Sequence, residues 1–156
     1  MKKKILIAIS IFVVAIVAMG AVSAFEFPDL GSIFGMKPDQ NVTVDGVTFH
    51  VPGTYKENLN VSKNATVEDY NIFKVTNYAK GFIDDKSHIN ILISDYNGIT
   101  VDSNLINYMN GTAKNINGTD GYLHHDGISY TFSYKKDNKV ISIQTEKEDL
   151  IGKVIA

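Results

Sequence analysis

The residues best suited to chemistry in this sequence are three neighbours, His124, His125 and Asp126. Neutral imidazoles and a carboxylate are common zinc ligands, and His50 and His88 lie on other predicted strands that can neighbour this position. Adjacent residues of a β-strand point to opposite faces, so the two histidines bind one ion only if the turn after them brings them together. Two interpretations therefore stay open: a metal site at these three residues, or solvent-exposed histidines at a turn.

The segment 115–121 combines oxygen-bearing side chains with glycines at short spacing, which is typical of calcium-binding loops. It lacks the charged carboxylate that starts such loops and the bidentate glutamate that ends them. A glycine-rich loop with one glycosylation acceptor is therefore the simpler interpretation.

Two pairs of acidic residues, Asp84 with Asp85 and Glu146 with Glu148, are candidates for acid–base catalysis. Glycoside hydrolysis requires two carboxylates that face each other across a cleft, and closeness in sequence does not provide this. Charges at a turn and at the start of a helix explain both pairs. The chain also has no G-x-S-x-G nucleophile motif, P-loop or dinucleotide-binding motif, so we predict no catalytic residue and no cofactor.

Tyrosines recur in or at the ends of the predicted strands. Two or three of them on one exposed face would form a platform for sugar rings or for a partner protein. The alternative is that they are half-buried members of a sheet. The five residues are Tyr78, Tyr96, Tyr122, Tyr130 and Tyr134.

Five N-x-[ST] sequons occur without proline in the middle position, and such sequons are typical of an outer surface that carries glycans. Because the chain is rich in Asn, Ser and Thr, one or two of them are expected by chance. The acceptor residues are Asn41, Asn60, Asn64, Asn110 and Asn117.

The N-terminus determines the predicted compartment. Three lysines at positions 2–4 precede an apolar run over residues 5–22. A soluble amphipathic helix would carry polar residues along one face, and this run has no such face. Positive charge stays on the cytoplasmic side of a membrane, so the chain from residue 25 onward is predicted to lie outside the cytoplasm.

Residues 1–24 are interpreted as either a signal peptide or an uncleaved signal anchor. Val22 and Ala24 suit signal peptidase and predict cleavage after Ala24, although Val22 is larger than the residue that the enzyme prefers, and a cut after Ser23 is the alternative. The apolar run is intermediate in length between a signal peptide and a bilayer-spanning helix. Secretion and single-pass attachment to the cell membrane, with the N-terminus inside, both stay open.

Residues 41–156 are predicted to form one domain, which follows a linker or juxtamembrane segment over residues 25–40. The apolar side chains of this linker either dock on the domain or lie at the lipid interface. Without the three N-terminal lysines the chain has 12 basic and 17 acidic residues, a net charge of −5, and it has no arginine. This balance argues against nucleic acid and nucleotide partners. Since the chain has no cysteine, packing and hydrogen bonds alone must stabilise the domain.

Alternating apolar and polar residues predict a strand-rich domain. The clearest signal is a hairpin over residues 42–51 with the turn Asp45-Gly46, while the polar stretch 58–66 is interpreted as a loop. This order predicts an α+β fold, with one antiparallel sheet of about six strands, an N-terminal hairpin and a C-terminal meander, covered by one internal and one C-terminal helix. The further strands are predicted at residues 68–79, 88–96, 121–125, 128–134 and 139–145, and the helices at residues 102–109 and 146–155.

The run from Val47 to Gly53, an apolar strand followed by Pro-Gly, resembles the opening of PsbP-like domains, and residues 139–155 are similar to the way in which these domains end. PsbP-like proteins are α/β/α sandwiches around an antiparallel sheet, are often exported, and act as assembly or accessory factors more than as enzymes. The resemblance covers residues 42–155 as a pattern and transfers no functional residue. The chain is also similar to small exported archaeal proteins of uncharacterised families in its lysine-rich start, its sequons and its single domain.

These observations predict an exported or membrane-tethered protein of the cell envelope. We expect a non-enzymatic binding or accessory module, with an envelope protein or a glycan as its partner. Two alternatives stay open: a metal-dependent hydrolase centred on His124, His125 and Asp126, and a structural surface subunit that self-assembles.

We expect a reporter fused to the C-terminus to be labelled from outside the cell, because positive charge at residues 2–4 holds the N-terminus inside. Intact-mass measurement of the chain from its native host should then show whether residues 1–24 are lost and whether glycans are attached. A reporter that is labelled only in the cell interior would contradict export.

Overall fold

The computed structural model describes residues 37–102, 106 and 111–155, which include ten β-strands and the helix α3. All pairings between the strands are antiparallel. The elements are β1 (Gln40–Val44), β2 (Val47–Val51), β3 (Lys56–Glu57), β4 (Lys63–Asp69), β5 (Lys74–Ile83), β6 (His88–Asn97), β7 (Thr112–Ile116), β8 (Thr119–His125), β9 (Tyr130–Lys136), β10 (Lys139–Thr145) and α3 (Glu148–Val154).

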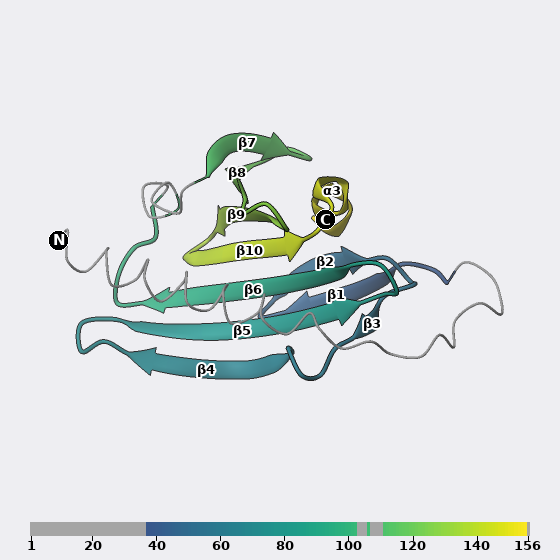
Figure 1. Cartoon of the computed structure of the whole chain (residues 1–156). Helices are drawn as coiled ribbons and strands as arrows, with labels where there is room; N and C mark the ends of the chain where they lie inside the picture. Colours follow the sequence, from purple (N-terminus) through teal and green to yellow (C-terminus); the bar gives the residue numbers. More distant parts are fainter. Residues whose placement is uncertain (1–36, 103–105, 107–110, 156) are drawn as a thin grey trace.

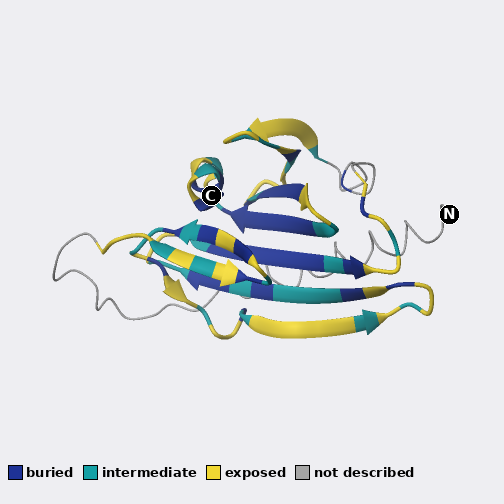
Figure 2. Cartoon of the chain, turned by 180° about the vertical axis from the view of Figure 1, so that it is seen from behind, coloured by how far each residue is buried: buried dark blue, intermediate teal, exposed yellow. Residues whose placement is uncertain are grey.

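Eight of these strands form one sheet in the order β3-β5-β6-β10-β9-β8-β7 (Figure 1), in which β4 also pairs with β5. β1 and β2 form a separate hairpin that lies in front of this sheet when the molecule is seen from behind (Figure 2). The helix α3 packs with the hairpin on the same face of the sheet, since residues from both belong to one hydrophobic cluster.

The predicted α+β fold class is wrong, because strands dominate the described residues and α3 has only seven residues. Three strands were missed: the two-residue β3, β4, which begins within the stretch that was interpreted as a loop, and β7, which precedes the predicted meander. All three are exposed edge strands without hydrophobic alternation, so pattern analysis has no signal to detect. The predicted helix over residues 102–109 lies outside the described residues except for Asp102 and Ile106.

Two turns explain the remaining differences in the strands. The predicted strand 68–79 spans the end of β4, a turn and half of β5, because Asn71 adopts a φ of 65° and Tyr70 donates a backbone hydrogen bond to Phe73. The segment 115–121, considered for calcium, is the β7–β8 hairpin, with a φ of 51° at Asn117 and 80° at Gly118. Asn117-Gly118 is a strong sequence signal for such a two-residue hairpin turn, so the hairpin could have been predicted from the sequence.

The predicted N-terminal hairpin is present and closes the main core. Asp45 and Gly46 have φ of 43° and 78°, as a type I′ turn requires. The ammonium group of Lys139, at the start of β10, lies 2.7 Å from Asp45 Oδ2 and fixes this turn to the sheet. Phe49 is fully buried between the hairpin and the sheet and pairs with Ile155, just after α3.

The two faces of the sheet differ in chemistry. Odd-numbered isoleucines of β6 and β10 fill the main core beneath the hairpin and α3. The opposite face mixes apolar residues with buried or half-buried polar side chains that form hydrogen bonds with one another across strands. The polar pairs are Asn77 with Ser94, Ser133 with Ser142, Asn90 with Gln144, and Gln144 with Ser129.

We expect Phe49→Ala to lower the free energy of unfolding by about 3–5 kcal/mol, because it removes a fully buried ring and leaves a cavity under the hairpin. Thr48→Ala, on the exposed side of the same strand, should cost less than about 1 kcal/mol. Urea unfolding followed by circular dichroism measures both variants. Equal losses for the two would show that the hairpin does not close the core.

Candidate functional site

The turn between β8 and β9 presents an apolar and aromatic tip. Ile128 is 79% exposed, the largest fraction among the exposed large hydrophobic residues of the described chain. Beside it the rings of His125 and Tyr130 are stacked, with centroids 4.2 Å apart and an angle of 20° between their planes. We call residues His125, Ile128 and Tyr130 the β8–β9 tip.

Asp126 holds this turn in one conformation. Its Oδ1 accepts hydrogen bonds from the backbone N–H groups of Ile128 and Ser129, both at 2.8 Å, and its Oδ2 accepts one from Ser129 Oγ at 3.2 Å. The backbone hydrogen bonds from Ser129 and Ile128 lower the pKa of the Asp126 carboxyl below its ordinary value. Because Ser129 is buried, this network anchors the tip to the body of the sheet.

The structure does not bring the predicted metal ligands together. His124 lies opposite Thr131 and His125 opposite Tyr130, so adjacent strand positions direct the two histidines to opposite faces. The oxygens of Asp126 are engaged by the turn. In the described residues no group of three His, Asp or Glu side chains could hold a metal ion.

The other two histidines are engaged elsewhere. His50 Nδ1 lies 2.7 Å from Asn41 Oδ1 on the hairpin. Glu146, just after β10, accepts a hydrogen bond of 2.8 Å from the backbone N–H of His88 and pairs with its Nδ1. Burial raises the pKa of Glu146, but the hydrogen bonds from His88 outweigh this effect and leave the pKa below its ordinary value.

A carboxylate that orients an imidazole also occurs in catalytic triads, where the imidazole acts as a general base for a nucleophile. The Nε2 of His88 is buried and has no hydrogen-bond partner in the described part of the chain, so no nucleophile is in place there. The pair instead links the first residue of β6 to the residue that follows β10. Sequence reasoning missed it because the two residues are 58 positions apart.

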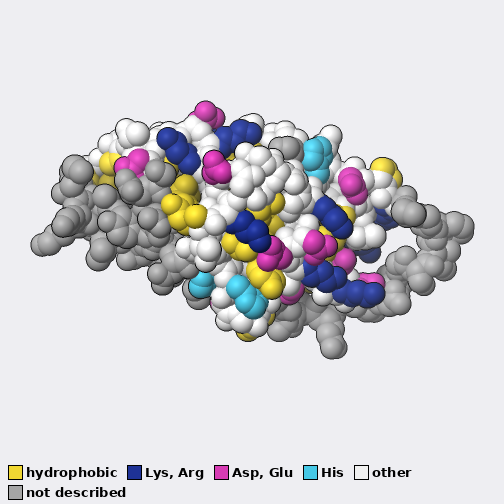
Figure 3. Space-filling model, turned by 90° about the horizontal axis from the view of Figure 1, so that it is seen from above, with side chains coloured by type: hydrophobic (Ala, Val, Ile, Leu, Met, Phe, Trp, Pro, Cys, Tyr) yellow, Lys and Arg dark blue, Asp and Glu magenta, His cyan; other side chains and the backbone are white. Residues whose placement is uncertain are grey.

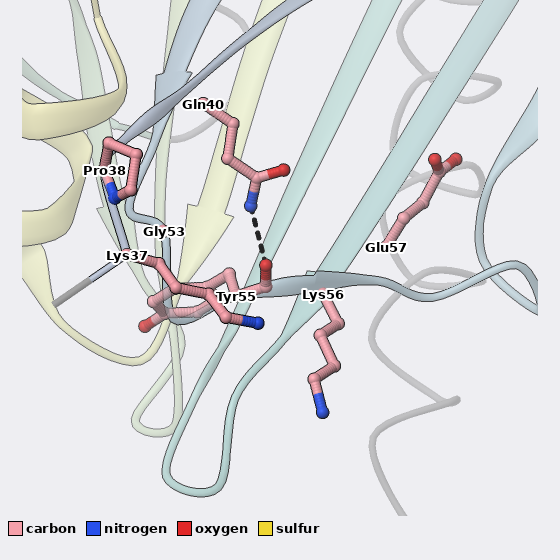
Figure 4. A pocket seen from close by; sticks show the side chains of 7 residues that line it. All are labelled: Lys37, Pro38, Gln40, Gly53, Tyr55, Lys56 and Glu57. Carbon is pink, nitrogen blue, oxygen red and sulfur yellow. Dashed lines mark hydrogen bonds between the residues drawn. The ribbon is translucent and has the colours of Figure 1, made fainter. Parts of the chain in front are cut away.

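A surface hollow next to β3 has no polar groups that converge on one point. Its volume is about 450 Å³. Gln40 Nε2 donates a hydrogen bond of 2.7 Å to the backbone oxygen of Tyr55, while Lys56 and Glu57 point to opposite sides of β3 (Figure 4). Tyr55 directs its hydroxyl to Ser87, and burial raises the pKa of that hydroxyl. Ligand sites require a few polar groups that aim at one point, and this hollow lacks them.

Of the two alternatives for the tyrosines, the structure favours half-buried or buried members of the sheet, and no platform forms on one exposed face. Tyr96 and Tyr134 are buried, and burial raises the pKa of Tyr134 to about 12. Tyr78, Tyr122 and Tyr130 are half-buried. Tyr78, Tyr130 and Tyr134 pack against the core under the hairpin, whereas Tyr96 and Tyr122 belong to the opposite face. Of the five, Tyr130 alone reaches the β8–β9 tip.

The predicted glycan acceptors lie at the surface wherever the structure describes them. Asn41, Asn60, Asn64 and Asn117 are exposed, and Asn110 lies outside the described residues, as do residues 1–24 with the cleavage site at Ala24. None of the helical segments in the described ranges has the length and hydrophobicity to cross a bilayer.

Charges on the face that carries β7 and α3 are mixed in sign. Lysines and acidic side chains alternate across this face (Figure 3). Lys114 of β7 pairs with Glu148 of α3, which contributes to this neutral balance. Polyanions bind to continuous basic stripes, and this face presents none.

No protein-family model matches the chain, and neither the curated proteins nor the solved structures that were searched contain a match. The resemblance to PsbP-like domains therefore stays a prediction. The β8–β9 tip has to be judged from its own geometry.

We expect Glu146→Gln to destabilise the protein at neutral pH by about 1–2 kcal/mol, because it removes a charged partner of two hydrogen bonds at a site about a third exposed. The folded pKa of Glu146 is lower than its ordinary 4.5. The stabilising contribution of the Glu146 carboxylate to the free energy of unfolding is therefore present above about pH 4.5 and is lost as the pH falls through the folded pKa.

Urea unfolding between pH 7 and pH 3 measures this effect. The stability of Glu146→Gln should depend less on pH below 4.5 than that of the wild type. Glu148→Gln is the matched control, since its exposed pair with Lys114 contributes less. If Glu146→Gln and the wild type lose stability in parallel on acidification, the ionised carboxylate of Glu146 does not stabilise the fold.

Proposed function

We propose that this chain is an exported binding module of the cell envelope, tethered or released, and that the β8–β9 tip contacts its partner. The compartment rests on the lysines at positions 2–4 and the apolar run 5–22. The single observation that supports binding is the display of Ile128 on a turn that Asp126 rigidifies.

Exposed isoleucine contributes nothing to folding, and a single exposed residue needs no explanation by itself. The tip differs because its aliphatic side chain lies beside stacked rings on a turn with three hydrogen bonds to one carboxylate. A rigid loop loses little conformational entropy on binding, so it is suited to recognition. Burial of Ile128 in a partner would contribute about 1.5–3 kcal/mol.

An envelope protein is a better partner for this tip than a glycan. Sugar rings stack on flat aromatic faces. The rings of His125 and Tyr130 are stacked on each other, so each already covers one face of its neighbour. A protruding aliphatic side chain fits an apolar pocket of a protein, where such anchors give most of the binding energy. The accessory role predicted from the sequence agrees with such a partner.

We expect Ile128→Asp to lower recovery of the membrane partner by tenfold or more, because it places a charge in an apolar pocket. The assay is affinity capture of the full chain from detergent-solubilised native membranes, with quantitative mass spectrometry. Ala113→Asp is the matched control, since Ala113 is an exposed apolar residue on β7, outside both the tip and the β4 edge. Partner recovery that survives Ile128→Asp would rule out the tip, and capture of glycans alone would rule out a protein partner.

A further inference from the structure

β4 is an open edge of the main sheet. It pairs with β5 on one side, and no strand of the described residues pairs with its other side. Figure 2 shows β4 as an almost wholly exposed strand at the border of the sheet, and of its residues only Glu68 is half-buried. An exposed edge presents unpaired backbone N–H and C=O groups to any strand that can reach it.

Exposed hydrophobic residues are spaced along this edge. The described chain has four large hydrophobic residues that are clearly exposed, and three of them belong to β4 or its two flanking turns. Leu59 precedes β4, Val67 lies within it, and Ile72 follows it, with 78%, 60% and 49% of their surfaces exposed. Their concentration on one edge of the sheet favours an interaction surface at that edge.

The charges of β4 are arranged so that the strand complements itself. Lys63 begins the strand, and Glu68 and Asp69 end it. In an antiparallel pair of two copies, Lys63 of each copy lies opposite Asp69 of the other, which it would share with Lys74, the partner of Asp69 within its own copy at 3.0 Å. Leu59 of each copy lies near the end that carries Ile72. A parallel pair would instead place like charges opposite each other, which destabilises a sheet.

We propose that β4 pairs with β4 of a second copy of this chain, in an antiparallel arrangement around a twofold axis near Thr66. The same patch then serves both copies, and the assembly closes as a dimer. The other sheet edge, β7, is less suited: antiparallel pairing of its five residues with themselves places Lys114 opposite Lys114.

Two features of the edge limit the strength of this pairing. The register between β4 and β5 shifts between Lys63 and Thr66, so an extra residue in β4 twists the edge locally. A single pair of seven-residue strands also buries little surface, so the dimer should form only at high concentration. A glycan on Asn64, at the same edge, would compete with the second copy.

Cysteine cross-linking tests the arrangement well, because the chain has no cysteine of its own. The full chain is produced in a host without N-glycosylation, purified in mild detergent and oxidised under fixed conditions. Thr66→Cys places the new thiols near the twofold axis, within the 4.4–6.8 Å Cα separation of disulfides. Ala113→Cys, on the exposed edge strand β7, is the matched control.

A second experiment fixes the direction of the strands and does not depend on Thr66. Lys63→Cys and Asp69→Cys, both at exposed positions, are oxidised separately and as a mixture of differently tagged chains. Antiparallel pairing brings position 63 of one chain next to position 69 of the other. It keeps the two copies of position 63 about 20 Å apart, which is six residues along a strand, and likewise the two copies of position 69.

We expect Thr66→Cys to give at least fivefold more disulfide-linked dimer than Ala113→Cys, and the mixture to give at least fivefold more than either single variant. Equal yields for Thr66→Cys and Ala113→Cys would overturn the proposal. A higher dimer yield for Lys63→Cys alone than for the mixture would also overturn it, because it indicates parallel strands. Preferential cross-linking of Thr66→Cys to Ala113→Cys in a mixture would overturn it too, because it indicates an open chain of copies.

Discussion

The pairing of β6 with β10 is the constraint on which the rest of the structure depends. Ile91 lies opposite Ile143 and Ile93 opposite Ile141, so one register places four buried isoleucines on the same face. A shift by one residue would exchange them with the polar residues of the other face. Both strands are flanked by partners, β5 on one side and β9 on the other, and this makes them the centre of the sheet.

The elements that cover the core are attached to this central pair of strands. The hairpin and α3 pack on the isoleucine face, and the ion pair of Lys139 with Asp45 ties the hairpin turn to the start of β10. At the other end of β10, Glu146 binds His88 at the start of β6. Two charged contacts thus secure opposite ends of the strand that carries the core.

The tip and the open edge lie on different sides of this centre. β8 and β9, which carry the tip, follow β10 in the sheet, whereas β4 lies beyond β5. A dimer through β4 would therefore leave both β8–β9 tips free. Two tips on one assembly bind a partner with two copies more tightly than a single tip does, without any new contact. The two proposals are compatible, and each can fail without the other.

The sequence alone determined the local elements whose signals are short-ranged: the Asp45-Gly46 hairpin, the alternating strand β6, and the amphipathic segment that became α3. It did not reveal β4 and β7, because an exposed strand that is held by backbone hydrogen bonds carries no hydrophobic period. It did identify His125 and Asp126, but as metal ligands. Only the tertiary structure could show that strand pairing stacks His125 on Tyr130 and that the turn engages Asp126, because these contacts depend on the register of β8 against β9.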